Sequence, residues 1–488
     1  MKNRILYVSL KNIKAVKNGI VFFPDFDISE KGDLADSKSS VLGIYGQNGS
    51  GKTTLYNCFD LLKTLSLGRP IYSFTDDGFR LKNKYSYLVN MFSESGTIEY
   101  GFLINYNNTP FKVIYRLTLN SIKENDTVNI RIKEEKLYAY KYFETGERWK
   151  RPFAPLVVNY EQEGFLYLYD GVDHESGYSQ SFKNTSDNIT LFAAKKKCTD
   201  LGLSFIFSEE NINFLMNDSK MDVKTFGNII DKLRHQLAFE MFLFAHNNEA
   251  LSLVGLGSLL GTSITTNNEL HGAFGVSLNP FYIQESNLSD YRQFLKQINI
   301  FISSFVPGFE AKESILESRN VDGRKQVKIS INRKLDENNS LPLSEESSGI
   351  RKLFFISCAL IYIYGNQNGW LIVDEIDSGV YEDLLGEILL ALENTGKGQI
   401  MFTAHNLVPL ERVSPSSIVF TTYNVDNRFV QIKGLSHTNN LRDVYLRALK
   451  LGGQKEKLSS KVDTFDIEIA LGRAYKAFLA LKGESNGR

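Results

Sequence analysis

The stretch from Val41 to Thr54, VLGIYGQNGSGKTT, decides the fold class of this chain. Residues 41–45 form a short apolar run typical of a buried strand, and residues 53–65 have the apolar spacing of a helix. The glycine-rich loop between them matches the phosphate-binding pattern G-x-x-x-x-G-K-[ST] in full. A chance glycine-rich turn is the alternative, but a strand before the loop and a helix after it favour a phosphate-binding loop (P-loop, residues 46–53).

A P-loop binds nucleotide phosphates with its backbone. The glycines let amide N–H groups turn inward, and the helix after the loop adds the partial positive charge of its N-terminus. Lys52 is expected to reach the β- and γ-phosphates of ATP, and the hydroxyl of Thr53 is expected to bind Mg²⁺. The residues expected to bind the nucleotide are Gly46, Asn48, Gly49, Ser50, Gly51, Lys52, Thr53 and Thr54.

Two adjacent acids end a second apolar run, residues 371–373. Asp374 is expected to hold Mg²⁺, directly or through water, and Glu375 to orient or deprotonate the water that attacks the γ-phosphate. Strands that end in acids by chance are common, so the two acids alone do not distinguish a catalytic site from a chance pattern.

The residues after the acids strengthen that signal. Residues 376–379, which include Asp377, look like a loop that crosses a dimer interface, where Asp377 is expected to contribute to the nucleotide site. The next strand, residues 400–404, ends at His405, which is expected to contact the γ-phosphate. A lone histidine is more often structural, but strand, acids, strand and histidine come in the order that the chemistry needs.

The segment 344–352, SEESSGIRK, precedes an apolar helix. Here the sequence resembles the ABC/SMC/RecF class of ATPases, and Ser347, Ser348 and Gly349 align with its signature loop (signature segment, residues 347–349). The resemblance implies that Ser347 and the amides near Gly349 bind the γ-phosphate of ATP held by a partner subunit, with the helix dipole directed at it. An ordinary capped helix start is the alternative.

The resemblance covers residues 1–65 and 341–430. It implies an α/β fold, an ABC-type ATPase head with a β-rich subdomain and a mostly helical insertion, which forms a homodimer or a higher homo-oligomer through its heads. The acidic strand, the signature segment and His405 with Asn406 look most like the standalone AAA-type ATPases of bacterial phage-defence systems, namely the ATPase subunits of PARIS and Septu and the ATPase half of OLD-family nucleases. Such a subunit would be a switch or sensor that controls a separate effector, a nuclease or a toxin.

Several features depart from the class. No glutamine occurs between Gln47 and Gln162, so the class's glutamine loop is missing or replaced, and Asn90 is a candidate replacement. The absence of a CxxC hook and of long heptads argues against SMC proteins and zinc-hook repair ATPases. About fifty residues follow His437, too few for a TOPRIM nuclease domain. The chain itself is therefore predicted not to be a nuclease.

Composition limits the partners. Lys+Arg and Asp+Glu both number 56 in 488 residues, which argues against wholesale coating of nucleic acid but permits a local basic groove. Residues 195–197 and 148–151 are short basic runs that could touch phosphates, although a solvated surface is the alternative. The N-terminus does not read as a signal peptide, and the apolar run 353–364 is too short to span a bilayer. We expect a buried helix there, no membrane partner and a cytoplasmic location.

Cys58, Cys198 and Cys358 show no metal spacing and read as reduced thiols of a cytosolic protein. The spacing predicts a hairpin over 5–23 with its turn at Asn18 and Gly19, strands within 72–142, helices at 222–245 and 287–305, and strands over 314–332. The expected divisions are an N-terminal head half (1–66), a β-rich subdomain (67–188), a helical insertion (189–312), a C-terminal head half (313–437) and a helical tail (438–488).

Three functions compete for such a chain. The first is the defence ATPase described above, and the second is a RecF-like repair ATPase that clamps DNA. The third is the ATP-binding subunit of an ABC transporter, which the missing glutamine loop and the long insertion disfavour. The neutral composition disfavours the second function, because a RecF-like ATPase would be expected to have a concentrated basic face.

Overall fold

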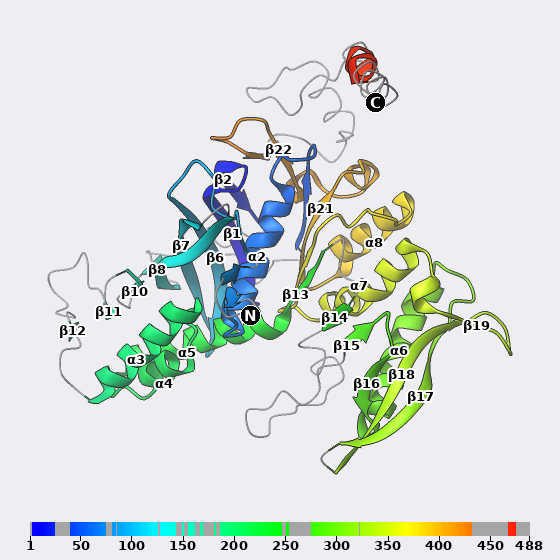
Figure 1. Cartoon of the computed structure of the whole chain (residues 1–488), viewed down its shortest axis with the longest axis horizontal. Helices are drawn as coiled ribbons and strands as arrows, with labels where there is room; N and C mark the ends of the chain where they lie inside the picture. Colours follow the sequence, from blue (N-terminus) through cyan, green and yellow to red (C-terminus); the bar gives the residue numbers. More distant parts are fainter. Residues whose placement is uncertain are drawn as a thin grey trace, which may run out of the picture.

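A computed structural model shows two large sheets with helices between and around them (Figure 1). The residues that it describes are 2–24, 40–74, 81–83, 85–124, 127–142, 149–150, 155–161, 166–168, 180–181, 186–245, 250–252, 275–321, 323–431 and 467–474.

The central sheet has six strands in the order β13-β20-β21-β3-β22-β23. The first five run parallel, and β23 is antiparallel to β22. Its inner strands are continuous apolar runs because both faces are covered. The carboxyl ends of β3, β21 and β20 meet at one edge, so the P-loop, His405 and the two acids come together. The strands are β3 (Ser40–Tyr45), β13 (Met241–Phe244), β20 (Trp370–Val373), β21 (Gln399–Ala404), β22 (Ile418–Thr421) and β23 (Phe429–Val430).

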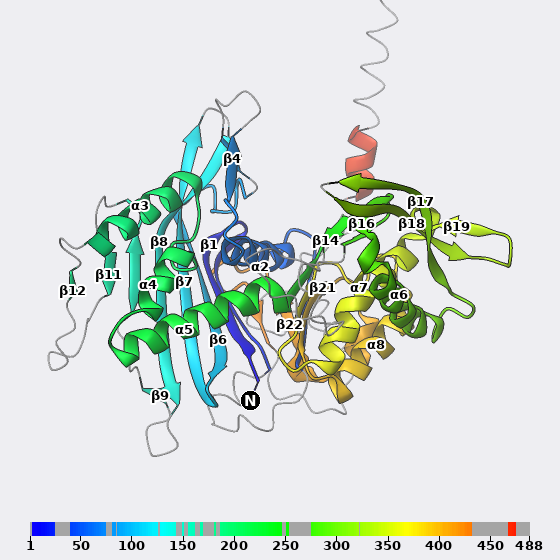
Figure 2. The same ribbon diagram turned by 90° about the horizontal axis from the view of Figure 1, so that it is seen from below.

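Helices cover both faces of this sheet. Figure 2 shows α2 (Lys52–Ser66) between the two large sheets, with α7 (Ser348–Gly365) and α8 (Glu382–Thr395) on the other side of the central sheet. Among the described helices only α7 is long and apolar enough to cross a membrane, and 61% of its span lies buried inside the protein. It packs in the core formed with β20 and β21. The predicted buried helix is confirmed.

The second sheet is antiparallel and has nine strands in the order β12-β11-β10-β8-β7-β6-β1-β2, with β9 beside β8. The ring of Phe102 in this sheet stacks on Trp370 of the central sheet, with centroids 5.7 Å apart. The strands are β1 (Arg4–Ile13), β2 (Val16–Phe22), β6 (Ser95–Tyr106), β7 (Thr109–Glu124), β8 (Thr127–Tyr142), β9 (Trp149–Lys150), β10 (Leu156–Asn159), β11 (Leu166–Leu168) and β12 (Gln180–Ser181).

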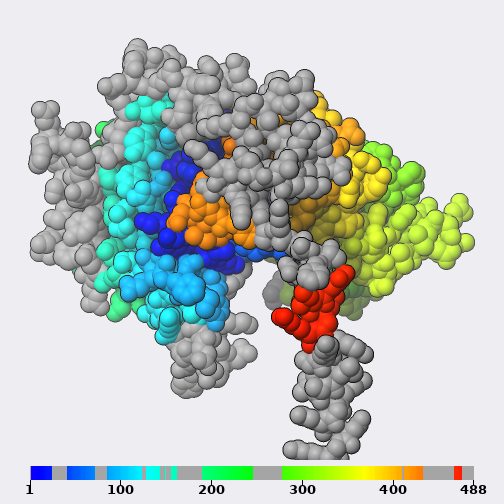
Figure 3. Space-filling view, turned by 90° about the horizontal axis from the view of Figure 1, so that it is seen from above, coloured from blue at the N-terminus to red at the C-terminus, as the bar shows by residue number. Residues whose placement is uncertain are grey.

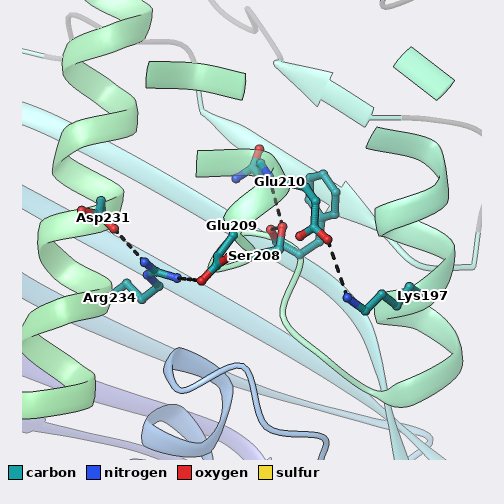
Figure 4. Close-up of polar contacts among 8 residues, drawn as sticks. Lys197, Ser208, Glu209, Glu210, Asp231 and Arg234 are labelled. Carbon is teal, nitrogen blue, oxygen red and sulfur yellow. Dashed lines mark hydrogen bonds and ion pairs between the residues drawn. The ribbon is translucent and has the colours of Figure 1, made fainter. Parts of the chain in front are cut away.

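Three helices, α3 (Ser186–Leu201), α4 (Glu209–Met216) and α5 (Met221–His235), lie on the nine-stranded sheet. Ion pairs join them: Arg234 of α5 contacts Glu209 at the start of α4, and Lys197 of α3 contacts Glu210 (Figure 4). These pairs are largely exposed and contribute little stability. A buried interaction joins the segment between α3 and α4 to the sheet more strongly. Glu135 of β8 is fully buried and accepts hydrogen bonds from Ser204 Oγ and the Phe205 N–H.

A smaller lobe packs α6 (Leu288–Ser303) against a four-stranded antiparallel sheet. Its strands are β16 (Phe281–Gln284), β17 (Ala311–Val321), β18 (Arg324–Lys334) and β19 (Ser340–Pro342), and the short pairs β4 (Tyr72–Phe74) with β5 (Leu81–Asn83) and β14 (Ala250–Ser252) with β15 (Gly275–Ser277) complete the described strands. The predicted α/β fold class, with a β-rich part, is confirmed.

The N-terminal hairpin turns at a different place from the one predicted. Ile13 pairs with Val16, so the turn is at Lys14 and Ala15, and Lys14 takes a positive φ of 45°. Gly19 instead lies within β2, where a Cβ atom would come 2.6 Å from the ring of Phe429. The glycine therefore serves a close contact between strands rather than the turn, and sequence spacing alone cannot distinguish these uses.

The helix predicted over 222–245 is too long. Helix α5 ends at His235, a π-helical turn (Gln236–Glu240) comes next, and 241–244 form the core strand β13, which pairs with β20. The segment 189–312 thus contains core and peripheral strands as well as helices. The predicted helix over 287–305 and the strands over 314–332 are confirmed as α6, β17 and β18. The domain boundaries stay predictions, and most of the predicted tail, 438–466 and 475–488, lies outside the described residues.

Candidate functional site

The P-loop lies between β3 and α2 with its backbone in the conformation that its glycines allow. Gly46, Gly49 and Gly51 have φ angles of 157°, 76° and 99°. Lys52 is buried, and its Nζ donates to the carbonyls of Gly46 at 2.7 Å and Gln47 at 3.0 Å. The lysine side chain therefore lies on the inner side of the loop, while Asn48, Gly49 and Thr53 are exposed. Phosphate oxygens could replace the two carbonyls as acceptors.

Strand β22 holds the P-loop from behind. The hydroxyl of Thr421 donates to Ser50 Oγ at 2.6 Å, and Ser50 Oγ donates to the Gln47 carbonyl at 2.6 Å. A Cβ atom on Gly46 would lie 1.6 Å from Thr421 Oγ1, so only glycine fits there. In Figure 3 the orange residues after β21 lie against the blue N-terminal hairpin, where the Asn18 N–H donates to the carbonyl of Val425.

Asp374 and Glu375 end β20 and are fixed by one residue of β21. The fully buried Thr403 donates its hydroxyl hydrogen to Asp374 Oδ1 at 2.6 Å and accepts the Glu375 N–H at 2.7 Å. Glu375 has a positive φ of 50°, which is uncommon outside glycine and costs on the order of 1–3 kcal/mol. This conformation is held by contacts on both sides of the residue, and such strain is concentrated at functional sites.

Hydrogen bonds within one chain join the 376–379 loop to the backbone at His405. Asp377 Oδ2 accepts the backbone N–H groups of His405 at 2.8 Å and Asn406 at 2.7 Å. Its carboxylate therefore orients the loop that carries His405, whose side chain is exposed. The predicted contact of Asp377 with nucleotide stays a prediction.

The signature segment begins α7. Ser347 is the N-cap, and its hydroxyl accepts the Ile350 N–H at 3.3 Å, as the ordinary capped-helix interpretation requires. Ser347 and Ser348 are nevertheless exposed at the start of an 18-residue helix. Gly349 is buried, and a Cβ atom there would lie 1.9 Å from the carbonyl oxygen of Gly379. The segment therefore packs on the 376–379 loop of its own chain.

Two lysines, Lys52 and Lys14, have pKa values that burial lowers. Burial lowers the pKa of Lys52, and Asp374, Glu375 and Asp377 oppose that shift. Burial also lowers the pKa of Lys14, at the hairpin turn, while Cys58 and Asp374 oppose the shift.

The oxygen atoms at this sheet edge fit Mg²⁺. Thr53 offers an exposed hydroxyl at the first turn of α2, and Asp374 offers a carboxylate at the end of β20, which are the hard oxygen ligands that Mg²⁺ prefers with substrate phosphates. Within the described part of the chain, no group of three or more His, Cys, Asp and Glu could hold a metal by itself. A metal here would therefore depend on the nucleotide for further ligands.

The structure brings most predicted residues to one sheet edge and adds others that the sequence did not indicate. The P-loop, Asp374, Glu375, Asp377 and His405 share that edge, and the signature segment packs beside them. Asn90 Nδ2 donates to the Lys14 carbonyl of the hairpin turn at 2.6 Å, and its Oδ1 accepts the nearby Phe92 N–H. Its role as a replacement for the glutamine loop stays a prediction. The residues that sequence reasoning missed are Lys352, whose ammonium group donates to the backbone carbonyl of Glu375, and the two threonines, Thr403 and Thr421. Thr403 alone carried a usable signal, since it is a lone hydroxyl in an apolar strand.

Comparison with known proteins finds solved structures that resemble this chain at low sequence identity. No protein-family profile and no curated protein matches the chain. It is similar to an Smc head bound to the C-terminal winged-helix domain of ScpA (12% identity, TM-score 0.38, 88% of this chain and 97% of that one). It is also similar to the SMC head domain from Thermotoga maritima (14%, 0.32, 88% and 100%) and to an Smc head domain with an extended coiled coil, bound to the C-terminal domain of ScpA derived from Pyrococcus furiosus (10%, 0.37, 93% and 100%). Likenesses this distant carry no conclusion about what this chain binds or does.

Proposed function

We propose that this chain is an ATP-binding and hydrolysing switch whose heads close in pairs over two ATP molecules. The observation that supports it most is the meeting of three groups at one edge of a parallel sheet. These are a P-loop with a buried lysine, two adjacent carboxylates fixed by Thr403, and a histidine at the end of the strand between them. Phosphoryl transfer to water needs these parts and little covalent chemistry from the protein.

Each group has a distinct task. The P-loop amides and Lys52 bind the phosphates, and Glu375 orients or deprotonates the attacking water. His405, on a loop fixed by Asp377, contacts the γ-phosphate. Mg²⁺, held by Thr53 and Asp374, would neutralise charge on the phosphates. Hydrolysis removes the bound γ-phosphate and with it the bias toward the closed form.

The second half of each site comes from another copy of the chain. Ser347 and Ser348 are exposed at the N-terminus of α7, where backbone N–H groups and the helix dipole favour an anion. A phosphate held in the P-loop of a second copy could reach them from solvent. Two such contacts related by a twofold axis make a closed dimer.

Ser347→Arg is expected to block closure of the dimer but not the binding of ATP by the monomer. The long side chain would occupy the space that a partner's phosphate needs. Sedimentation with saturating ATP and Mg²⁺ should show a monomer that still binds ATP. Ser286→Arg, at an exposed serine in the short 3₁₀ turn (Glu285–Asn287) just before α6, is the control and should dimerise normally. A Ser347→Arg protein that dimerises like the wild type would contradict the role of the signature segment.

We further propose that the switch serves bacterial anti-phage defence by controlling a separate effector. Support for this role is the resemblance of the signature segment and of His405 with Asn406 to standalone defence ATPases. Phage plating on cells that carry the native locus tests it. The wild type should protect, and Glu375→Gln should not. Absence of protection by the wild type across a broad phage panel would remove the defence role, and DNA binding at varied salt would then be measured.

A further inference from the structure

Lys352, one turn into α7, reaches from this helix to the segment that follows β20, where Glu375 lies. Its Nζ donates to the backbone carbonyl of Glu375 and lies 3.5 Å from that of Ser378. The two carbonyls belong to the chain segment that leaves β20 and forms the 376–379 loop. A single lysine therefore contacts both the residue expected to act as base and the loop beyond it.

The packing around this contact is tight. Gly349, three residues before Lys352, lies so close to the carbonyl of Gly379 that a Cβ atom would come within 1.9 Å of it. Gly379 itself has a positive φ of 75°. The helix start and the 376–379 loop thus touch at two points, the paired glycines and Lys352, and they form one packed unit within the chain.

Lys352 also completes the support of Glu375. The N–H of Glu375 donates to Thr403 from one side, and its carbonyl accepts from Lys352 on the other. These contacts fix the peptide groups on both sides of the residue with positive φ, and they set the direction in which its side chain leaves the backbone. Lys352 is half-buried. This burial lowers its pKa to about 8, although Asp377, Glu375 and Asp374 oppose the shift.

We propose that Lys352 is a positioning residue that links α7, the helix that begins at the signature segment, to Glu375 of the same chain. The helix start would bind a partner's nucleotide, and Lys352 holds the carbonyl of Glu375 in register with that helix. Binding of a partner's phosphate at the signature segment would thereby influence the position of the Glu375 carboxylate, which activates water at the chain's own P-loop. This inference rests on the proposed ATPase function.

The test compares Lys352→Met with the wild type in ATP hydrolysis and in ATP binding. Loss of the contact should lower kcat by about ten- to a hundredfold, the size of effect that a small misplacement of a catalytic group produces. The affinity for ATP should stay within about twofold, because Lys352 does not reach the P-loop. Lys352→Arg, which can donate to both carbonyls, should recover much of kcat. Should Lys352→Met not fold, Lys352→Gln, which keeps a donor but not the charge, is expected to lower kcat at unchanged ATP affinity.

Lys63→Met is the matched control. Lys63 is another half-buried lysine whose pKa burial lowers to about 8, and it donates to a backbone carbonyl, that of Met241 in β13. It should keep the wild-type kcat. Wild-type kcat in a folded Lys352→Met or Lys352→Gln protein, or an equal loss of kcat in Lys63→Met, would overturn this inference and leave the proposed function standing. A wild-type protein without ATPase activity would overturn the proposed function and this inference with it.

Discussion

Lys52→Ala is expected to abolish measurable binding of ATP. The buried ammonium group donates to two P-loop carbonyls, which phosphate oxygens would replace. A hydrogen bond to a charged group contributes about 1.5–3 kcal/mol, so the loss of two weakens binding by about 10²- to 10⁴-fold. Titration of the purified protein with a fluorescent ATP analogue in the presence of Mg²⁺ measures it.

Lys17→Ala is the control for loss of a lysine near the same loop. Lys17 lies on β2, is 61% exposed and pairs with Asp426 on the surface. Its replacement should leave the affinity for ATP unchanged, because exposed ion pairs contribute little. Wild-type affinity in Lys52→Ala would show that the P-loop assignment is wrong.

Glu375→Gln is expected to stop hydrolysis while ATP still binds. The amide has nearly the shape of the carboxylate and keeps the backbone contacts to Thr403 and Lys352, but it cannot accept a proton from water. General-base catalysis contributes about 10²- to 10⁴-fold, so kcat should fall by that factor. A phosphate-release assay with saturating ATP measures the rate.

The matched control for this variant is Glu382→Gln. Glu382 is an exposed acid in the first turn of α8, a few residues after the 376–379 loop. Its replacement should leave kcat unchanged within about twofold, since exposed substitutions of this kind have small effects. A Glu375→Gln protein that hydrolyses ATP at the wild-type rate would require a different base.

The P-loop and the acidic strand could be predicted from sequence because each is a local pattern. Glycines at fixed offsets between a strand and a helix leave few conformations, and Lys52 comes one residue after Gly51. The same holds for Asp374 and Glu375 at the end of an apolar run. Their meeting at one sheet edge is a consequence of parallel strands, whose carboxyl ends face the same way.

The support of the site could not be predicted, because it depends on contacts between distant segments. Thr403 reaches two acids nearly thirty positions earlier, and Lys352 contacts the backbone rather than another side chain. Periodicity likewise failed at β13, where a strand buried on both faces reads as the end of a helix. Gly19 suggested a turn, although its lack of a side chain serves the packing of Phe429.

The mass of the Glu375→Gln protein in solution, measured by light scattering with and without ATP and Mg²⁺, tests the central claim most directly. The proposed switch predicts that ATP and Mg²⁺ double the mass of the species present without nucleotide, and that ADP does not. A protein that binds ATP at its P-loop and shows the same mass with ATP, with ADP and without nucleotide would contradict closure of two heads over ATP.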